Sequence, residues 1–253
     1  MQKKEVIMII VIMIPVVLFY ITLLFLIFSF VICSLFCHRE RKKSKCLLRK
    51  KTSSVDCTKT EPQNLSVAKK IYSGLYPYLY GFSRFISIFI GHIPSHRVRK
   101  FFLKYILCLT FDPKAVIYGG FELRSPWNIK IGRSVIGAGA LLDGRNGIII
   151  EDDVCLAQAV SVYTEQHDLN DPLFRCNDKG GSVIIKQHAW VSSKTTILPR
   201  CVVEKGSVIA SGATLTKSTE AYGVYAGLPA KKIAQRNVNL QYKLGGNDFW
   251  HFY

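Results

Sequence analysis

Acidic residues and paired cysteines are both scarce in this sequence. Only 17 aspartate and glutamate residues stand against 34 lysine and arginine residues, which gives the 253-residue chain a formal net charge of +17. Eight cysteines occur, but none forms a CxxC pair and their spacing shows no regular framework. The pattern argues against a disulfide scaffold, and the simplest interpretation is free thiols in a reducing compartment.

Charged residues are absent from residues 6–36. A helix over this stretch, at about 1.5 Å per residue, would reach roughly 46 Å, which exceeds the roughly 30 Å hydrocarbon core of a bilayer. We therefore predict a single tilted or overhanging membrane span within residues 1–37. The alternatives are a cleaved signal peptide, whose apolar core would be much shorter, and a two-pass hairpin with marginally short arms.

A basic cluster follows this apolar stretch directly. Residues 39–51 contain eight lysines and arginines and one acid, Glu40, whereas only Lys3 and Lys4 precede the stretch. The positive-inside bias places the C-terminal side in the cytoplasm. The cluster also explains much of the net charge without nucleic acid. A nucleic-acid-binding tract is the alternative, and the cluster's position beside the membrane end disfavours it.

The next segments connect this anchor to the rest of the chain. Residues 38–66 are predicted to form the basic juxtamembrane segment and a polar linker. Residues 67–112 interleave aromatic, apolar and basic residues, which is typical of amphipathic helices in the membrane interface. An ordinary amphipathic helix that caps the following domain is the alternative, and both descriptions can hold together.

A six-residue repeat runs through residues 185–219. Six is an even number, so in extended chain the repeated residues all point to one side, whereas in a helix they would form no stripe. The pattern predicts a β-solenoid of short strands and turns, without fixing its handedness. A valine-rich sandwich is disfavoured because sandwich strands vary in length. The repeated aliphatic residues are Ile185, Val191, Ile197, Val203, Ile209 and Leu215, and a small residue lies two places before each of the last five.

Less regular repeats precede this run. We predict a solenoid over residues 113–233, which begins near Val116, and a tail over residues 234–253 that packs on the solenoid or on the membrane-proximal helices. After Val162 the chain leaves the repeat in a loop that lasts until about Val183, and solenoids carry function on such insertions. The other predicted inward positions are Ile131, Val135, Leu141, Ile150 and Leu156, with a loop at residues 143–147.

The outward phase of the repeat contains two residues of chemical interest. Cys155 and Ser161 lie between inward neighbours, and His167 follows Ser161 by six, so we expect the imidazole to point outward where the loop leaves. Trp190 is also expected to point outward. An exposed indole on a flat face requires a covering subunit or ligand.

Three motifs resemble those of the hexapeptide-repeat sugar O-acetyltransferases, in particular the membrane-associated exopolysaccharide branch such as the colanic-acid acetyltransferases. Residues 164–174 are similar to the catalytic loop of that family, residues 189–191 to its tryptophan-bearing repeat, and residues 226–231 to its C-terminal glycine-x-proline-alanine signature. The resemblance covers about residues 95–236. It implies a mainly β fold, a left-handed parallel β-helix of triangular section, together with a homotrimer that uses acetyl-CoA.

The resemblance also implies roles for individual residues. His167 would be the general base, because a neutral imidazole with an ordinary pKa of about 6.5 can take the proton of a hydroxyl that attacks a thioester. Asp143 would bind the substrate hydroxyl or orient the imidazole, and Glu165 is a second candidate for orienting it. For both carboxylates, simple solvation is the alternative. We expect the imidazole to lie in a cleft beside the indole of Trp190.

The acetyl-CoA contacts of the family also map onto this sequence. Lysines suit the CoA phosphates and turn amides suit the pantetheine, although Lys217 and Lys231 could equally be solvated. Ser192 departs from the family pattern, which commonly has glycine there. The matching positions are Trp190, Ser193, Ser211, Gly212, Thr216, Lys217 and Lys231.

Two other chemistries fit the sequence poorly. A zinc site on this fold needs three histidines, and the solenoid has only His167 and His188, of which His188 is expected to be exposed at a turn. No metal is therefore predicted. Cys176 lies on the loop, but no base partner is evident for it, which disfavours a cysteine nucleophile.

The sequence therefore predicts a single-pass membrane enzyme with a cytoplasmic catalytic domain. It would transfer an acetyl group from acetyl-CoA to a hydroxyl of a sugar in a polysaccharide or glycolipid precursor, with a free or lipid-linked acceptor and no nucleic acid partner. The alternatives are a sugar N-acetyltransferase and a non-catalytic solenoid that scaffolds a membrane assembly.

Overall fold

The computed structural model describes residues 2–52, 67–176 and 180–246. Its first element, α1 (Gln2–Thr52), is one continuous helix of 51 residues. Residues Met13–Lys45 form a candidate membrane span by length and composition. The helix continues through the basic cluster, where we expected a separate juxtamembrane segment. The predicted linker, residues 53–66, lies outside the described residues.

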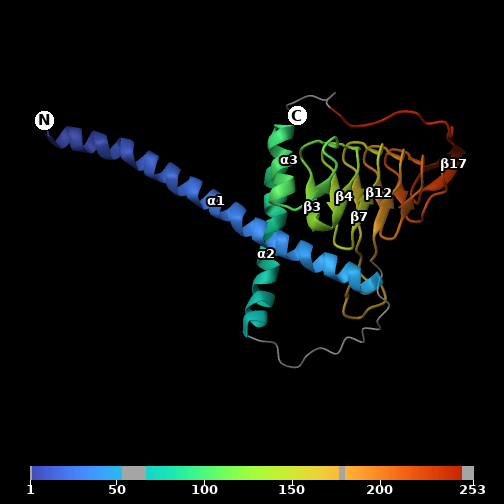
Figure 1. Cartoon of the computed structure of the whole chain (residues 1–253), viewed down its shortest axis with the longest axis horizontal. Helices are drawn as coiled ribbons and strands as arrows, with labels where there is room; N and C mark the ends of the chain where they lie inside the picture. The colour runs from blue at the N-terminus through green and yellow to red at the C-terminus, as the bar shows by residue number, and fades with distance from the viewer. Residues whose placement is uncertain (1, 53–66, 177–179, 247–253) are drawn as a thin grey trace.

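The N-terminal half of α1 extends away from the rest of the protein (Figure 1). Every described side chain from Met13 to Phe28 is exposed, and Ser29 is the first buried residue. From there on α1 packs against the other elements, with the Phe30 ring centroid 5.0 Å from that of Phe102 and the Phe36 centroid 5.6 Å from that of Trp127. The exposed part therefore has the apolar surface all round that is typical of a helix in lipid.

Two further helices cap the first coil of the solenoid. They are α2 (Val67–Gly91) and α3 (His96–Tyr105). The Ser87 hydroxyl accepts a 2.8 Å hydrogen bond from the Leu123 amide, and the Arg99 guanidinium donates to the Ile117 carbonyl at 2.8 Å. These bonds satisfy backbone groups at the open edge of the stack, which would otherwise be buried without a partner. The capping alternative is confirmed.

The remaining chain is a parallel β-solenoid, as predicted, although its first strand starts before residue 113. Its coils stack side by side (Figure 1), and the described residues form three sheets, or faces, in which strands of successive coils pair in parallel. Face 1 is β1-β4-β7-β10-β13, face 2 is β17-β16-β14-β11-β8-β5-β2, and face 3 is β15-β12-β9-β6-β3. Each coil visits faces 1, 2 and 3 in turn, so the turns stack into three corners, called here corner 1–2, corner 2–3 and corner 3–1.

The strands are two to five residues long. Their bounds are β1 Thr110–Phe111, β2 Val116–Ile117, β3 Glu122–Arg124, β4 Ile129–Ile131, β5 Val135–Ile136, β6 Leu141–Asp143, β7 Ile148–Ile150, β8 Cys155–Leu156, β9 Ser161–Val162, β10 Val183–Ile185, β11 Trp190–Val191, β12 Thr196–Ile197, β13 Val202–Val203, β14 Val208–Ile209, β15 Thr214–Leu215, β16 Gly223–Ala226 and β17 Lys231–Gln235, and a short 3-10 helix, η1 Pro126–Asn128, lies between β3 and β4.

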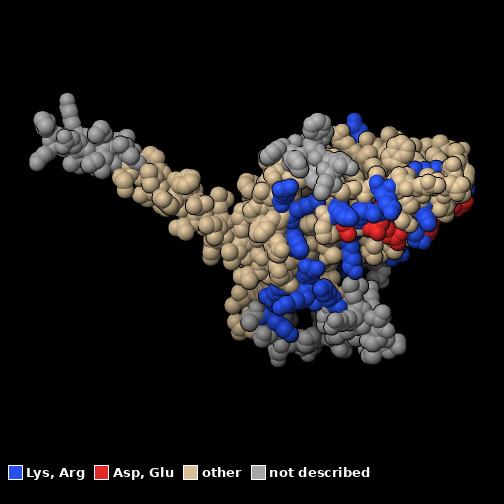
Figure 2. All heavy atoms as spheres, turned by 45° about the horizontal axis from the view of Figure 1, so that its top comes forward, with Lys and Arg blue, Asp and Glu red and all other residues tan. Residues whose placement is uncertain are grey.

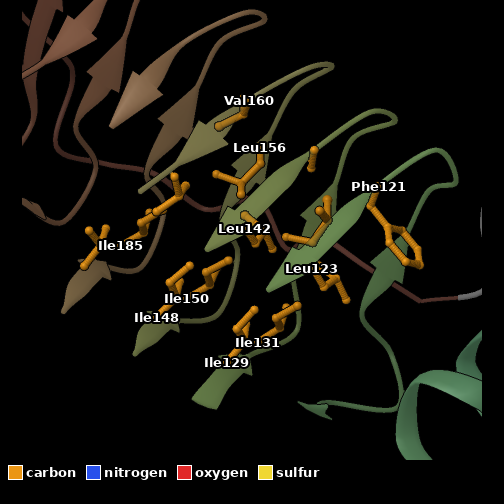
Figure 3. Close-up of a cluster of buried hydrophobic side chains, with 14 of the residues drawn as sticks. Phe121, Leu123, Ile129, Ile131, Leu142, Ile148, Ile150, Leu156, Val160 and Ile185 are labelled. Carbon is orange, nitrogen blue, oxygen red and sulfur yellow. The ribbon is translucent and has the colours of Figure 1, made fainter. Parts of the chain in front are cut away.

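Stacked aliphatic side chains fill the interior of the solenoid (Figure 3). The six inward residues of the 185–219 repeat are all buried, which confirms that phase. In the earlier coils Ile131, Ile150 and Leu156 are also buried as predicted. At two positions the prediction was wrong by one residue, because Ile136 and Leu142 are buried while Val135 and Leu141 face outward. The physical reason is the turn between β4 and β5, residues 132–134, which is one residue shorter than residues 151–154 of the next coil.

The tail returns along corner 1–2. After β17 pairs antiparallel with β16, the Tyr242 carbonyl lies 3.0 Å from His188 Nε2, and the Leu244 amide donates to Asp153 at 2.9 Å. The Gly246 amide then donates to the Lys114 carbonyl of the first coil at 2.9 Å. The tail therefore packs on the solenoid as far as residue 246, and residues 247–253 lie outside the described part.

The corrected phase gives a stability prediction with an internal control. Leu142→Ala should lower the free energy of unfolding by about 2–4 kcal/mol, because it opens a cavity in the core. Leu141→Ala removes the same atoms from an outward side chain and should cost less than about 1 kcal/mol. Chemical denaturation of the detergent-solubilised chain, followed by circular dichroism, measures both, and equal losses would contradict the observed phase.

Candidate active site

The loop between β9 and β10 leaves the solenoid at corner 3–1, and its first residue is clamped to the preceding coil. The fully buried Thr164 hydroxyl donates to the Asp143 carbonyl at 2.6 Å and accepts from the Asn146 amide at 3.0 Å. The Asn146 side chain donates to the Thr164 carbonyl at 2.7 Å. The point at which the loop departs is therefore fixed by three hydrogen bonds.

Arg145 joins the two carboxylates that we predicted at this site. Its guanidinium holds both oxygens of the fully buried Asp143, at 2.9 and 2.6 Å, and lies 3.1 Å from Glu165. These hydrogen bonds with Asp143 raise the pKa of Arg145. Asp143 and Glu165 are both held by Arg145, and this bridge braces the root of the loop.

The His167 side chain is exposed on the loop and is oriented by the backbone. Its Nδ1 lies 2.6 Å from the Phe174 carbonyl oxygen, and its ring stacks on the Phe174 ring with centroids 4.0 Å apart. A carbonyl can only accept, so Nδ1 donates to it, and Nε2 is the nitrogen that can act as an acceptor in the neutral ring. The Phe174 carbonyl thus takes the position in which we expected Glu165 or Asp143.

The described part of the loop is held together by its own hydrogen bonds. The Asp168 amide donates to the Arg175 carbonyl at 3.0 Å, and Arg175 Nε donates to the Asp171 carboxylate at 2.7 Å. The apolar side chains of the loop nevertheless face outward, and Leu169 is 92% exposed. Leu173 and Phe174 are also exposed. A loop with this ordered backbone and apolar surface has the character of a contact region.

Cys176 has a base neighbour, contrary to the expectation from sequence. Its Sγ lies 3.5 Å from Nδ1 and 3.8 Å from Nε2 of His167. Desolvation and the nearby Glu165 carboxylate raise the pKa of the Cys176 thiol. A raised thiol pKa disfavours the nucleophilic thiolate form of Cys176.

The indole and the imidazole lie on different sides of the solenoid within one chain. Trp190 is in β11 on face 2, between Cys155 and Val208 of the neighbouring strands, and is 45% exposed. Corner 3–1, from which the His167 loop departs, is the corner opposite face 2. The predicted cleft with both rings side by side is therefore not formed by a single chain.

Most of the predicted acetyl-CoA contacts follow corner 2–3. The Gly212 amide donates to the Ser193 carbonyl at 3.0 Å, and Ser211 is exposed beside them. Gly212 has a φ of 71°, which favours glycine, and an added Cβ would meet nothing within 4 Å. Lys231 is exposed at the far end of the same corner, where it pairs with Ala226. Trp190 is in β11, the strand that leads into this corner.

Two predicted contacts lie elsewhere. Thr216 and Lys217 are exposed where the chain leaves β15, at the opposite edge of face 3. Face 3 itself is flat and carries a row of outward hydroxyl residues, Ser161, Thr196 and Thr214, in register. The corner 2–3 residues and the His167 loop therefore flank one flat, polar face.

His188 is buried, and the expectation that it is exposed was wrong. It lies under the returning tail, with its Nε2 3.0 Å from the Tyr242 carbonyl and 3.8 Å from Asp153. Within residues 2–52, 67–176 and 180–246, no group of three or more histidine, cysteine or acidic side chains could hold a metal ion.

Known proteins share segments of this sequence, although no family model matches it. A dTDP-4-amino-4,6-dideoxy-D-glucose acyltransferase from Escherichia coli is 25% identical over 130 residues, which is 48% of this chain and 64% of that enzyme. A probable macrolide acetyltransferase from Lysinibacillus sphaericus is 38% identical over 56 residues, or 22% of this chain and 31% of that protein. The matches thus span less than two thirds of these relatives.

Solved structures establish the fold. A hexapeptide-repeat acetyltransferase from Vibrio cholerae, solved with acetyl coenzyme A, superposes with a TM-score of 0.57 at 16% identity, over 69% of this chain and 93% of that one. A maltose O-acetyltransferase from Clostridium difficile 630 gives a TM-score of 0.56 at 20% identity, over 64% and 89% of the two chains. The solenoid described above is thus the fold of the hexapeptide-repeat acetyltransferases.

Two contributors to the site were not predicted. Arg145 belongs to a loop that the repeat pattern identifies only as an interruption, and its pairing with two acids depends on how two coils stack. Phe174 acts through its carbonyl oxygen, which every residue has, so no side-chain motif could have pointed to it. The exposed apolar residues that surround Phe174 in the loop are the signal that was available.

The Arg145 bridge gives a second stability prediction. Arg145→Leu leaves the buried Asp143 carboxylate unpaired and should cost about 2 kcal/mol, less than for a fully buried pair because Arg145 is half-exposed. The double variant with Asp143→Asn should recover part of that loss. Lys205→Leu on an exposed turn is the control. Thermal unfolding of these variants, of Asp143→Asn alone and of the wild type measures the effect, and a double variant whose loss is the sum of the two single losses would show that the two side chains are not coupled.

Proposed function

We propose that this protein is an acyl-CoA-dependent acetyltransferase that acts on a hydroxyl of a sugar in a polysaccharide or glycolipid precursor. The observation that carries the proposal is His167 on an exposed loop, held through Nδ1 by the Phe174 carbonyl, which leaves Nε2 as the nitrogen that can accept a proton. The fold and the matched acyltransferases support the acyl-CoA part of the proposal. The exopolysaccharide branch of the sequence resemblance is the source of the acceptor class.

In the proposed reaction a single imidazole accepts and then returns one proton. Nε2 of His167 takes the proton of the sugar hydroxyl while the oxygen attacks the thioester carbonyl of acetyl-CoA. The tetrahedral intermediate expels the CoA sulfur, and the imidazolium returns its proton to that sulfur. The products are the acetylated sugar and free CoA, and the histidine ends in its original state. No covalent enzyme intermediate is required.

The proposed active form is a homotrimer, because one chain keeps the imidazole and the corner 2–3 residues on different edges. In a threefold assembly, corner 3–1 of one copy faces corner 2–3 of the next. His167 of one copy then reaches the edge that carries Trp190, Ser193 and Gly212 of its neighbour. The exposed Leu169, Leu173 and Phe174 of the loop support such a contact.

The location proposed for the enzyme is a membrane, with the solenoid on the cytoplasmic side. The candidate span in α1 and the basic residues after it support this orientation. This orientation would give the solenoid access to cytosolic acetyl-CoA, which the proposed reaction consumes.

Removal of the imidazole tests the catalytic role. His167→Ala should lower kcat for acetyl transfer by about 10²–10⁴-fold, the usual contribution of a general base, with little change in CoA binding. His92→Ala, which changes an exposed histidine in the turn after α2, should keep full activity. Radiolabelled acetyl transfer in purified membranes measures the rates, and undiminished activity of His167→Ala would refute the assignment.

A mixture of two inactive variants tests the shared site. Trp190→Ala and His167→Ala should each be inactive in isolation. When both are co-expressed in equal amounts, about one quarter of the sites should contain an intact His167 from one copy and an intact Trp190 from the next. Activity should therefore return to roughly a quarter of the wild-type value. Failure of the mixture to regain activity would mean that the two rings do not serve one site.

A second candidate is N-acetylation of an amino sugar, because the matched Escherichia coli enzyme is named for an amino-sugar acceptor. Esters and amides differ in their lability to mild alkali, so treatment of the labelled product separates the two activities. A non-catalytic scaffold is the remaining alternative. It predicts that CoA does not raise the melting temperature of the protein, whereas a CoA-binding enzyme must be stabilised by its ligand.

A further inference from the structure

Corner 3–1 forms a continuous column from the membrane-span helix to His167. Phe36 of α1 packs edge-on against Trp127 of η1, with ring centroids 5.6 Å apart. The neighbouring Asn128 side chain donates to the Arg145 carbonyl at 3.4 Å. Arg145 and Asn146 in turn hold Glu165 and Thr164 at the root of the His167 loop. The candidate active site is thus connected step by step to α1.

This column is short. The His167 loop leaves the third coil, whereas α1 rests on the first, so two strand spacings separate them along the solenoid axis. At 4.7–4.9 Å per spacing, that separation is roughly 10 Å. A sugar attached through a phosphate to a lipid in the bilayer can bridge this gap, while the far end of the solenoid lies well beyond it.

An apolar groove lies between α1 and α3, with a volume of about 500 Å³. Its size is within the range of small-molecule pockets, and the Ser34 hydroxyl is its one polar side chain, which already donates to the Tyr105 carbonyl at 3.0 Å. Such a surface suits a hydrocarbon chain. The lining residues are Leu23, Leu26, Ile27, Phe30, Val31, Ser34, Leu35, Phe102 and Ile106.

The groove face of α1 becomes cationic toward the solenoid. Ile27, Val31 and Ser34 are followed on the same helical face by His38, Arg41 and Lys45, at spacings of three and four. Arg41 donates to the Thr110 hydroxyl at 3.0 Å and Lys45 is exposed. Lysine and arginine side chains cover the region where the helices meet the solenoid and continue over the solenoid, whereas the described part of the protruding helix shows none (Figure 2). The face therefore matches a molecule with an apolar tail and an anionic head.

The neighbouring helices extend the apolar surface beside the groove. Exposed apolar residues recur along one side of α2 at spacings of three, four and seven, and Phe101 and Tyr105 continue the surface on α3. This arrangement fits a platform that rests on lipid. The exposed residues on α2 are Val67, Ile71, Leu75, Tyr78, Phe85 and Phe89.

We propose that the acceptor sugar is carried on a membrane lipid through a phosphate, with its hydrocarbon chain in the α1–α3 groove and its phosphate near Arg41 and Lys45 of α1. The sugar then extends along corner 3–1 to His167. This inference rests on the proposed acetyltransferase function and names its substrate class. A soluble oligosaccharide or a nucleotide sugar would make no use of the groove.

The first experiment compares two forms of the same acceptor. Glycolipid extracted from the producing cell and the glycan released from it by mild acid, which cuts the sugar–phosphate bond, are both offered to the full-length protein with labelled acetyl-CoA. We expect kcat/KM for the lipid-linked form to be at least about tenfold higher than for the released glycan. Such a ratio requires only a modest part of the binding energy that burial of a hydrocarbon chain supplies. Equal values would overturn the inference while the acetyltransferase function stands, and labelling of neither form would refute that function itself.

The second experiment alters the groove and the cationic end separately. Leu35→Trp fills the groove, and Lys45→Glu reverses a charge farther along the same face of α1. Each should raise KM for the lipid-linked acceptor about tenfold and leave KM for acetyl-CoA unchanged. Leu24→Trp, on an exposed part of α1 outside the groove, and Lys205→Glu, on a distant turn, are the matched controls. Equal effects in variants and controls would overturn the inference.

A binding measurement gives a readout that does not depend on activity. Undecaprenyl phosphate is the probe, and native mass spectrometry of the intact protein detects the complex. We expect the Leu35→Trp protein to lose the bound probe and the Leu24→Trp protein to retain it. If phosphatidylglycerol displaces the probe at equal concentration, the groove binds bulk bilayer lipid only, and the proposed acceptor class is wrong.

Discussion

The backbone ladder of the parallel coils constrains everything else in this protein. Each strand pairs with the equivalent strand of the next coil, so each face keeps its register and the inward aliphatic side chains stack in columns. Extra residues cannot enter a strand without turning its side chains inside out, and they must leave at a corner. The His167 loop obeys this constraint. Its position at corner 3–1 follows from the ladder, and its root is then fixed by Thr164 and Asn146.

The same ladder explains how far the sequence could be interpreted. The repeat from Ile185 to Leu215 has turns of constant length, so its period alone identified every inward residue. The earlier coils contain one shortened turn, and a period cannot reveal a missing residue when both Val135 and Ile136 are aliphatic. The exposure of Trp190 and His167 followed from the phase, but their separation did not. That separation depends on which face each strand joins, and equal spacing along the chain does not specify the face.

The candidate site also combines interactions of very different range. Asp143, Arg145 and Glu165 come together because corners of successive coils stack directly, and carboxylates that look like catalytic candidates in the sequence are satisfied by one guanidinium. The orientation of His167 depends instead on a carbonyl seven residues away in the same loop. A motif records side chains, so it could place the imidazole on the loop and could not show which atom holds it.

The returning tail changes how the solenoid can unfold. In a simple solenoid each coil contacts only its neighbours, and the terminal coil can fray alone. Here the segment from Arg236 to Gly246 bonds in turn to residues of five different turns along corner 1–2, from Tyr222 and Gly206 through His188 and Asp153 to Lys114. The distal coil cannot unravel far without releasing this strap, which couples it to the coil under the helices. Loss of structure should thus be a concerted event instead of a gradual unzipping.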